Sequence, residues 1–283
     1  STAVLSNYYL LKIIEEAGLP PGVINFIPGS GPLISEIVLK HKELAGIHFT
    51  GSNPTLNTLW KQVSDNLPVY RSYPKIVGET GGKDFIFAHS SADPPTLATA
   101  IIRGAFEYQG QKCSAASRAY IPESIWKETS DYLLQMCPEI KTGDVTDFEN
   151  FMNAVIDEKA FDKIMSYINK AKKSTDVKII CGGNGDKTEG YFIEPTLIVT
   201  QDPHFITMEE EIFGPVMTIF VYKDDRYEET LKLCDETSPY GLTGSIFSRD
   251  KYAMITACRM LRFAAGNFYI NDKPTGALVG QQP

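Results

Sequence analysis

Hydrophobic and polar positions along the chain recur with two periods, one typical of helices and one typical of strands. Apolar side chains recur on one helical face of residues 1–16, and Gly18 follows as a residue suited to end a helix. The pattern predicts helices over residues 1–16, 33–40, 53–66, 96–108, 122–136, 158–173, 227–237 and 250–263. It predicts strands over residues 23–27, 46–49, 75–78, 84–88, 118–121, 177–180, 196–199, 216–222, 243–247 and 267–270.

The order of these elements predicts the fold class. Strands that alternate with helices at this spacing favour right-handed crossovers and a parallel sheet, so we expect an α/β fold. The best domain boundary is the glycine-rich run at residues 78–83. It divides the chain into a first domain, residues 1–78, and a second domain, residues 79–283.

Composition narrows the class of protein. At 283 residues, with 43% hydrophobic and 22% charged residues, the chain is typical of a soluble globular protein. A net charge of -8 argues against a nucleic-acid or anionic-membrane partner. No apolar run approaches the roughly 18 residues of a membrane span.

Cysteine spacing excludes two kinds of site. The five cysteines are Cys113, Cys137, Cys181, Cys234 and Cys258. Their number is odd and no C-x-x-C pair occurs, so neither a disulfide framework nor a zinc ribbon is indicated. The histidines show no ligand spacing, and we expect no metal. A reducing compartment fits this usage.

Two short runs suggest covalent chemistry. Cys113 lies in Phe-Glu-Tyr-Gln-Gly-Gln-Lys-Cys-Ser-Ala, residues 106–115, and Glu79 lies upstream in Gly-Glu-Thr-Gly-Gly-Lys, residues 78–83. A thiolate is a good nucleophile, and a carboxylate in a glycine-lined turn can accept a proton from it or from water. A lone cysteine is otherwise a small buried hydrophobic residue, and the other four cysteines keep that interpretation.

Two further runs suggest ligand contacts. Gly51 and Ser52 end a strand and open a helix, where backbone N–H groups favour a phosphate, although such a turn is often only a helix cap. Glu211 and Phe213 lie in Glu-Glu-Ile-Phe-Gly-Pro, which could otherwise be a solvated turn. The glycine-rich run at residues 182–185 does not fit a dinucleotide-binding motif and predicts a hairpin or loop.

The runs at residues 78–83 and 106–115, in that order, resemble those of the aldehyde dehydrogenase superfamily. The resemblance implies an aldehyde-dehydrogenase-like fold, with part of a Rossmann-type NAD-binding domain followed by an α/β catalytic domain. It implies that Cys113 is the nucleophile and Glu79 the general base. It further implies that Gly51 and Ser52 contact the pyrophosphate of NAD, Glu211 the nicotinamide-side ribose and Phe213 the nicotinamide.

The sequence departs from the family pattern at two places. The usual E-L-G-G-K reads E-T-G-G-K here, with Thr80 beside the expected base. In F-T-G-S-x-x-x-G, Leu56 and Asn57 stand where the last glycine would fall. The second departure puts close approach of a cofactor to that helix in doubt.

A narrower resemblance covers the whole chain. Residues 266–273 and 275–283 resemble dehydrogenases that oxidise L-glutamate γ-semialdehyde, formed from 1-pyrroline-5-carboxylate, to L-glutamate in proline catabolism. It implies that Ser114, Gly276 and Ala277 hold the substrate carboxylate, Ser114 through its hydroxyl and the other two through backbone N–H groups. It also implies a homo-oligomer, in the mitochondrial matrix of a eukaryote or otherwise in the cytoplasm.

The ends of the chain suggest an internal piece of a longer protein. In the family the oxyanion-hole asparagine and the lysine that binds the adenosine ribose lie in an earlier segment. We therefore expect the 283-residue chain alone to be nearly inactive. Two alternatives stay open, another aldehyde substrate and a truncated chain without catalytic activity.

Overall fold

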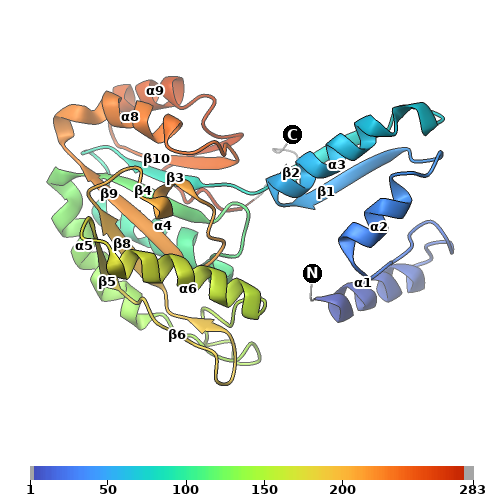
Figure 1. The fold of residues 1–283 in the computed structure, drawn as a ribbon. Helices are drawn as coiled ribbons and strands as arrows, with labels where there is room; N and C mark the ends of the chain where they lie inside the picture. The colour runs from blue at the N-terminus through green and yellow to red at the C-terminus, as the bar shows by residue number, and fades with distance from the viewer. Residues whose placement is uncertain (1–2, 277–283) are drawn as a thin grey trace. The chain divides into compact units, whose positions relative to one another are not determined.

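The computed structural model describes residues 3–276, which form two compact units that divide between Thr80 and Gly81 (Figure 1). The division falls inside the glycine-rich run that the sequence suggested as a boundary. Among the helices of residues 3–276, none has the length and apolar character needed to span a bilayer.

The first unit is built around a two-stranded parallel pair. Its elements are α1 (Val4–Glu16), α2 (Gly31–Val38), β1 (Gly46–Gly51), α3 (Asn53–Asp65), the 3-10 helix η1 (Leu67–Val69) and β2 (Lys75–Thr80). Within this unit the large apolar side chains that are fully buried are Leu39 and Val63. The Tyr70 hydroxyl donates to the carbonyl of Leu39 at 2.5 Å, which ties the segment before β2 to the end of α2.

One predicted strand of this unit is wrong. Residues 23–27 form an irregular connection between α1 and α2, although four of the five are apolar and three are β-branched. At the start of this run the N–H of Val23 donates to the carbonyl of Pro20, which forms a turn. A strand needs a neighbouring backbone to bond with, and none of the strands in residues 3–276 pairs with this run.

The second unit is a seven-stranded sheet with helices on both faces. Its strands are β3 (Asp84–Ala88), β4 (Ala116–Pro122), β5 (Val177–Cys181), β8 (Thr196–Thr200), β9 (Val216–Tyr222), β10 (Thr243–Phe247) and β11 (Asn267–Ile270), in the order β11-β10-β3-β4-β9-β8-β5. Its longer helices are α4 (Pro94–Phe106), α5 (Glu123–Met136), α6 (Glu158–Lys173), α8 (Tyr227–Glu236) and α9 (Lys251–Met260). Shorter elements are α7 (Ile206–Glu209), the hairpin of β6 (Gly185–Asp186) and β7 (Phe192–Ile193), and the 3-10 helices η2 (Glu107–Gly110), η3 (Cys137–Glu139) and η4 (Asp224–Arg226).

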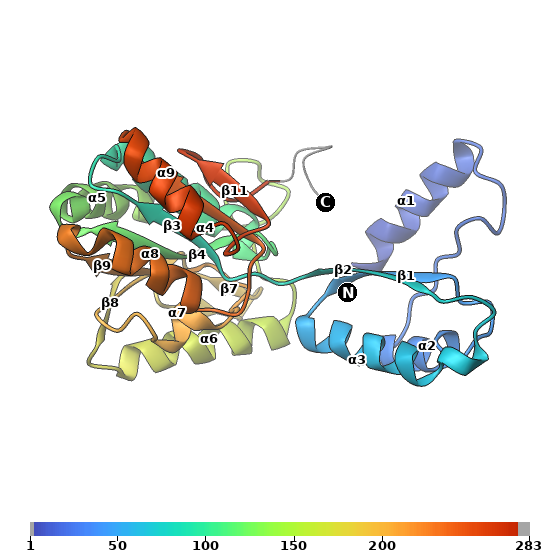
Figure 2. The same cartoon turned by 90° about the horizontal axis from the view of Figure 1, so that it is seen from above.

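The alternation of side chains along β3 divides the core between the two faces. Ile86 packs in the cluster beneath α4 and α5, whereas Phe85 and Phe87 pack beneath α8 and α9. Helices α6 and α8 lie on one side of the strands and α5 on the other (Figure 2). Every residue of β3 is buried, as expected for a central strand covered on both faces.

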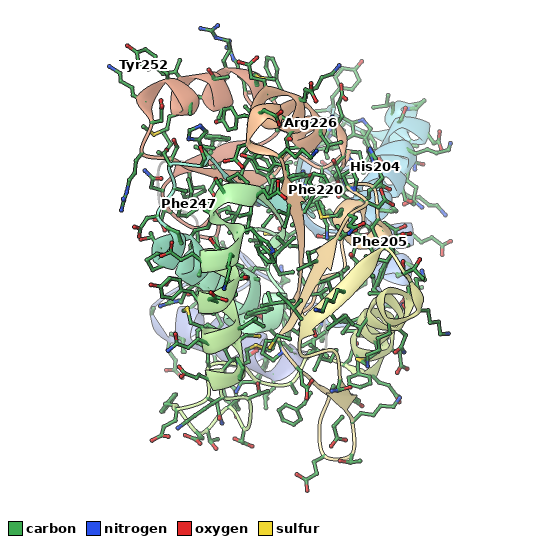
Figure 3. All side chains as sticks on the ribbon, turned by 90° about the vertical axis from the view of Figure 1, so that its left-hand side faces the viewer. His204, Phe205, Phe220, Arg226, Phe247 and Tyr252 are labelled. Carbon is green, nitrogen blue, oxygen red and sulfur yellow. The ribbon has the colours of Figure 1, made fainter. Side chains whose placement is uncertain are left out.

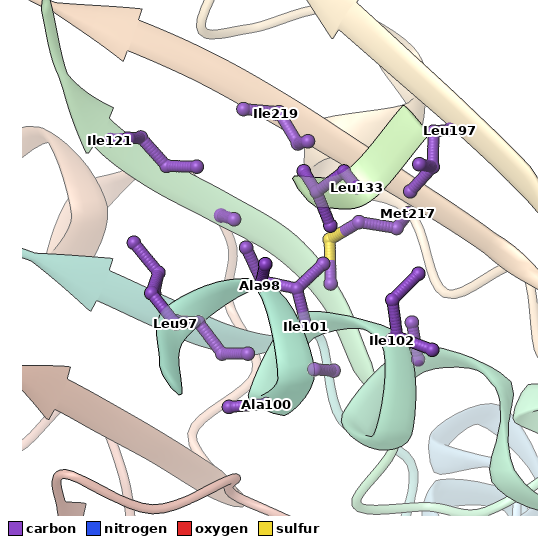
Figure 4. Close-up of a cluster of buried hydrophobic side chains, with 14 of the residues drawn as sticks. Leu97, Ala98, Ala100, Ile101, Ile102, Ile121, Leu133, Leu197, Met217 and Ile219 are labelled. Carbon is purple, nitrogen blue, oxygen red and sulfur yellow. The ribbon is translucent and has the colours of Figure 1, made fainter. Parts of the chain in front are cut away.

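The core beneath α4 and α5 is a continuous apolar cluster. Ile101, Leu133 and Ile219 converge in it from two helices and a strand (Figure 4). Phe247 belongs to the same packing, whereas Tyr252 on α9 is 80% exposed at the surface (Figure 3). The second unit therefore contains its own core.

Two predicted features of this unit need correction. The sheet is mixed rather than purely parallel, because β5 runs antiparallel to β8 and a returning hairpin reverses the chain between them. Helix α4 ends at Phe106 instead of residue 108, because Tyr108 and Gln109 take left-handed backbone angles that no α-helix accepts.

Candidate active site

Cys113 lies at the surface, in a turn between η2 and β4. The backbone reaches this turn through three consecutive residues with positive φ, Tyr108 at 55°, Gln109 at 58° and Gly110 at 64°. Left-handed backbone costs a residue with a side chain roughly 1–2 kcal/mol. A path of this kind persists only where surrounding contacts hold it.

Two glutamines of the cysteine run supply such contacts. The amide Nε2 of Gln109, which is buried, donates to the carbonyl of Ala154 at 3.3 Å. The side-chain Oε1 of Gln111 accepts from the N–H of Ile156 at 3.0 Å. Both glutamines thus dock the loop on the segment before α6, a role that the sequence alone did not reveal.

Gly110 brings the cysteine turn against a second candidate region. A Cβ at Gly110 would lie 2.4 Å from the carbonyl oxygen of Gly214, so only glycine fits there. Gly214 follows Phe213, which has a φ of 63° and a side chain that is 39% exposed. The turns that carry Cys113 and Phe213 are therefore in backbone contact.

Glu211 packs on the glycine turn that opens the second unit. Its Oε1 accepts from the N–H of Gly82 at 3.1 Å, and a Cβ at Gly81 would lie 2.1 Å from the same oxygen. Burial raises the pKa of Glu211, against the opposing effects of that N–H, Lys163 and Lys83. The approach of this partly buried carboxylate explains Gly81, whereas a Cβ at Gly82 would lie 2.4 Å from Asp84 Oδ2.

Arg118 holds the end of the same glycine turn through buried hydrogen bonds. Its buried guanidinium donates to the carbonyl of Lys83 at 2.8 Å and to the carbonyl of Cys234 at 3.1 Å. Burial and the nearby guanidinium lower the pKa of Lys83 to about 7, although Asp84 and Glu211 act in the opposite direction. The glycine turn is therefore anchored at Lys83 by a buried arginine.

The remaining candidates of the first unit gather at one end of the β1–β2 pair. Glu79 is the register partner of Thr50, directly before Gly51. Ser52 caps α3, where its Oγ accepts from the N–H of Thr55 at 3.4 Å. The predicted base and the predicted phosphate-binding turn thus share the carboxyl end of two parallel strands.

Leu56, which lies in α3 where the family pattern F-T-G-S-x-x-x-G has its last glycine, has a defined environment. A Cβ at Gly78 would lie 2.3 Å from Leu56 Cδ2, so the leucine side chain packs over the glycine of β2.

The predicted carboxylate anchor is described in part. Ser114 is partly buried in the cysteine turn, and Gly276 has a φ of 115°. The carbonyl of Gly276 accepts a hydrogen bond from the hydroxyl of Tyr269. Ala277 lies outside the described residues.

Glu107 is a site residue that the sequence analysis missed. Its carboxylate accepts from Lys112, the residue before Cys113, at 3.1 Å and from Lys273 at 2.9 Å. The signal available in the sequence was weak, a carboxylate at the end of a helical run. Its second lysine comes from a loop 166 residues further on, which periodicity does not locate.

Comparison with known proteins places these features in a family. The model of the aldehyde dehydrogenase family matches residues 1–283. Delta-1-pyrroline-5-carboxylate dehydrogenase of Dictyostelium discoideum is 57% identical over all of this chain and 51% of its own length. The human mitochondrial enzyme of that name is 50% identical, over all of this chain and 50% of its own length. The chain spans about half the length of these curated relatives.

Solved structures show the same relation. A structure of Delta-pyrroline-5-carboxylate dehydrogenase from Mycobacterium tuberculosis bound with NAD has a TM-score of 0.93 and 50% identity, over 99% of this chain and 51% of that one. The Thermus 1-pyrroline-5-carboxylate dehydrogenase with bound NAD has a TM-score of 0.91 and 34% identity, over 99% of this chain and 53% of that one. The chain therefore belongs to the aldehyde dehydrogenase family.

Proposed function

We propose that the protein carrying this chain oxidises L-glutamate γ-semialdehyde, formed from 1-pyrroline-5-carboxylate, to L-glutamate with NAD as cofactor. The observation that carries the proposal is the identity of 50–57% to curated delta-1-pyrroline-5-carboxylate dehydrogenases over the whole of this chain. The exposed Cys113 turn, held in an unusual backbone conformation, supports it because a nucleophile must be both accessible and rigidly placed.

In the proposed reaction Cys113 acts as the nucleophile. Its thiolate adds to the aldehyde carbon, and the carbonyl electron pair moves to oxygen to give the alkoxide of a thiohemiacetal. Loss of hydride from that carbon leaves a thioester on Cys113. Glu79 takes a proton from water, the resulting hydroxide attacks the thioester, and the acid leaves as the thiolate is restored.

The residues present fit a dinucleotide. NAD⁺ supplies the hydride acceptor when it is bound. Glu211 would accept the ribose hydroxyls, because its partly buried carboxylate is held by a single backbone N–H and keeps acceptor capacity. Gly51 and Ser52 would meet the pyrophosphate at the start of α3. Phe213 would pack beside the nicotinamide.

A cavity in the first unit fits the flat apolar part of a nucleotide. It has a volume of about 710 Å³ and lies between α2, β1 and α3. Ile34, Val38 and Leu59 contribute to its largely apolar wall. We assign residues 1–78 to the NAD-binding domain and residues 79–283 to the catalytic domain.

The substrate carboxylate would be held by Ser114, Gly276 and Ala277. One hydroxyl and two backbone N–H groups form a neutral set of donors suited to an anion. We further propose that the protein acts as a homo-oligomer and, in a eukaryote, in the mitochondrial matrix, because several curated relatives carry "mitochondrial" in their names.

The Ser114→Ala variant of the full-length protein tests this function. Buried donors without a partner cost about 1–3 kcal/mol each. Wild-type protein should prefer glutamate semialdehyde to pentanal, and the variant should lose roughly tenfold or more in kcat/KM for glutamate semialdehyde while pentanal oxidation is almost unchanged. NADH absorbance gives both rates. A wild-type protein without the preference would refute the proposed substrate.

A further inference from the structure

Glu107 joins two loops that are far apart in the sequence. Its side chain is only 15% exposed and accepts from Lys112 at 3.1 Å and from Lys273 at 2.9 Å, both through Oε2. Its other oxygen, Oε1, accepts from Arg103 at 2.5 Å. Lys273 continues the connection, because its Nζ also donates to the Thr275 hydroxyl at 2.7 Å. A single carboxylate therefore connects the residue before Cys113 to the segment that ends at Gly276.

Helix α4 also packs directly against residues 273–274. At Gly104 a Cβ would lie 3.6 Å from Lys273 Cβ, 3.7 Å from Pro274 Cδ and 3.2 Å from Ala116 Cβ. A Cβ there would meet Lys273 and Pro274 at ordinary van der Waals distance, so residues 273–274 pack directly beside the last turn of the helix. This packing is independent of the ion pairs and places residues 273–274 beside α4, the helix that ends before Glu107.

Helix stability accounts for only one of the three ion pairs of Glu107, the i,i+4 pair with Arg103 on α4. The residue caps the carboxyl end of α4, where the helix dipole disfavours a negative charge. Burial raises its pKa, but hydrogen bonds from Lys273, Arg103 and Lys112 outweigh burial and lower the pKa to about 2. Glu107 is thus an ionised carboxylate that is paired with one cation of its own helix, Arg103, and with two lysines outside the helix, Lys112 and Lys273.

We propose that Glu107 is a positioning residue that fixes the separation between the Cys113 turn and the 273–276 loop. The inference rests on the proposed function, in which Cys113 attacks the aldehyde and Gly276 helps to hold the carboxylate. The separation between these two loops then sets the length of the aldehyde acid that is oxidised. In this inference Glu107 acts on the two loops through Lys112 and Lys273.

The test compares Glu107→Gln with wild type in the full-length protein. The substrates are glutamate semialdehyde, the shorter succinate semialdehyde, the longer adipate semialdehyde and pentanal. Because small misplacements in a site can cost about 10²-fold in rate, we expect Glu107→Gln to lower kcat/KM for glutamate semialdehyde by roughly 10–100-fold, mainly through KM. Discrimination between the three acids should shrink, and the rate with pentanal should change by less than about threefold.

Matched variants separate positioning from folding. Glu149→Gln removes an exposed carboxylate paired with Lys141 in the same unit and should leave all four rates unchanged. Glu107→Asp keeps the charge and should restore part of the length discrimination. Lys273→Met added to Glu107→Gln should cost little more, because both changes break one connection.

The outcomes distinguish this inference from the function on which it rests. A wild-type protein that does not prefer glutamate semialdehyde refutes the proposed function whatever the variants do. Given that preference, equal losses on pentanal and glutamate semialdehyde would show that Glu107 has only a structural role. Unchanged rates and unchanged length discrimination in Glu107→Gln would also overturn the inference.

Discussion

The two units of this chain follow the same strand–helix pattern but bury very different shares of their apolar side chains. In the first unit, α1 and α2 have no buried residue, and Ile13 and Ile37 are 62% and 67% exposed. In the second unit, every residue of β3 and β10 is buried. Hydrophobic content in the sequence therefore does not by itself determine burial.

The difference lies in the neighbours of each strand. Within residues 3–276, β1 and β2 of the first unit each have one neighbouring strand. In the second unit five strands each have a neighbour on both sides: β10, β3, β4, β9 and β8. Parallel strands are stable when both faces are covered, and the second unit meets that condition with its own helices. We infer that the second unit provides most of the stability of the chain.

Loss of the thiol should have the largest effect. We expect Cys113→Ala in the full-length protein to reduce aldehyde oxidation to a trace, since the nucleophile is removed. Steady-state NADH formation measures this loss. Cys258→Ala is the matched control, because Cys258 is also exposed in the same unit, and it should keep wild-type activity. Substantial turnover by Cys113→Ala would assign the chemistry elsewhere.

A residue of the weakly packed unit should have the next largest effect. For Glu79→Gln we expect kcat to fall by roughly 10²–10⁴, the usual range for loss of a general base. Pre-steady-state measurements should then show a burst of NADH followed by a slow phase, because thioester hydrolysis becomes limiting. A normal steady-state rate without a burst would remove Glu79 from the mechanism.

Truncation of an apolar side chain should lower stability in the second unit and hardly change it in the first. Leu133→Ala removes a fully buried side chain and should lower the free energy of unfolding by about 2–5 kcal/mol. Ile37→Ala removes an exposed side chain and should change it by no more than about 0.5 kcal/mol. Urea unfolding of the 283-residue chain measures both values. Similar losses would contradict the contrast between the units.

The smallest expected effect is a pH dependence at Glu107. Its pKa of about 2 in the folded chain is lower than its ordinary value of 4.5, so its ionised form stabilises the folded state. This contribution is complete above about pH 4.5 and is lost as pH falls toward 2. The difference in unfolding free energy between wild type and Glu107→Gln should therefore be constant from pH 7 to 5 and shrink below that range. A difference that grows on acidification would contradict the assignment.

Local pattern predicted much of the fold, and its failures have a common physical cause. Residues 84–88 and 23–27 are both short apolar runs, yet only the first finds strand partners and becomes β3. Helix α4 was predicted two residues too long because Gln109 is held in left-handed backbone by Ala154, a distant contact. The periodicity of apolar residues reports on residues that are close in the sequence. It does not identify strand partners or side-chain contacts that are distant in the sequence.

The candidate site divides in the same way. Cys113 and Glu79 could be proposed from the sequence because their surrounding runs are specific, and their catalytic roles remain predictions. The contact between the Gly110 and Gly214 backbones and the cluster around Glu107 could not be predicted. Each depends on the sheet bringing together turns that the sequence separates.

Mass spectrometry of the full-length Glu79→Gln protein, mixed with NAD⁺ and glutamate semialdehyde, tests the central claim most directly. Slow hydrolysis should trap the acyl group, and peptide mapping should find a glutamyl adduct on the peptide that contains Cys113. The same mixture without NAD⁺ should give no stable adduct, because the thioester forms only after oxidation. An adduct on another cysteine, or none at all in the complete mixture, would contradict the account.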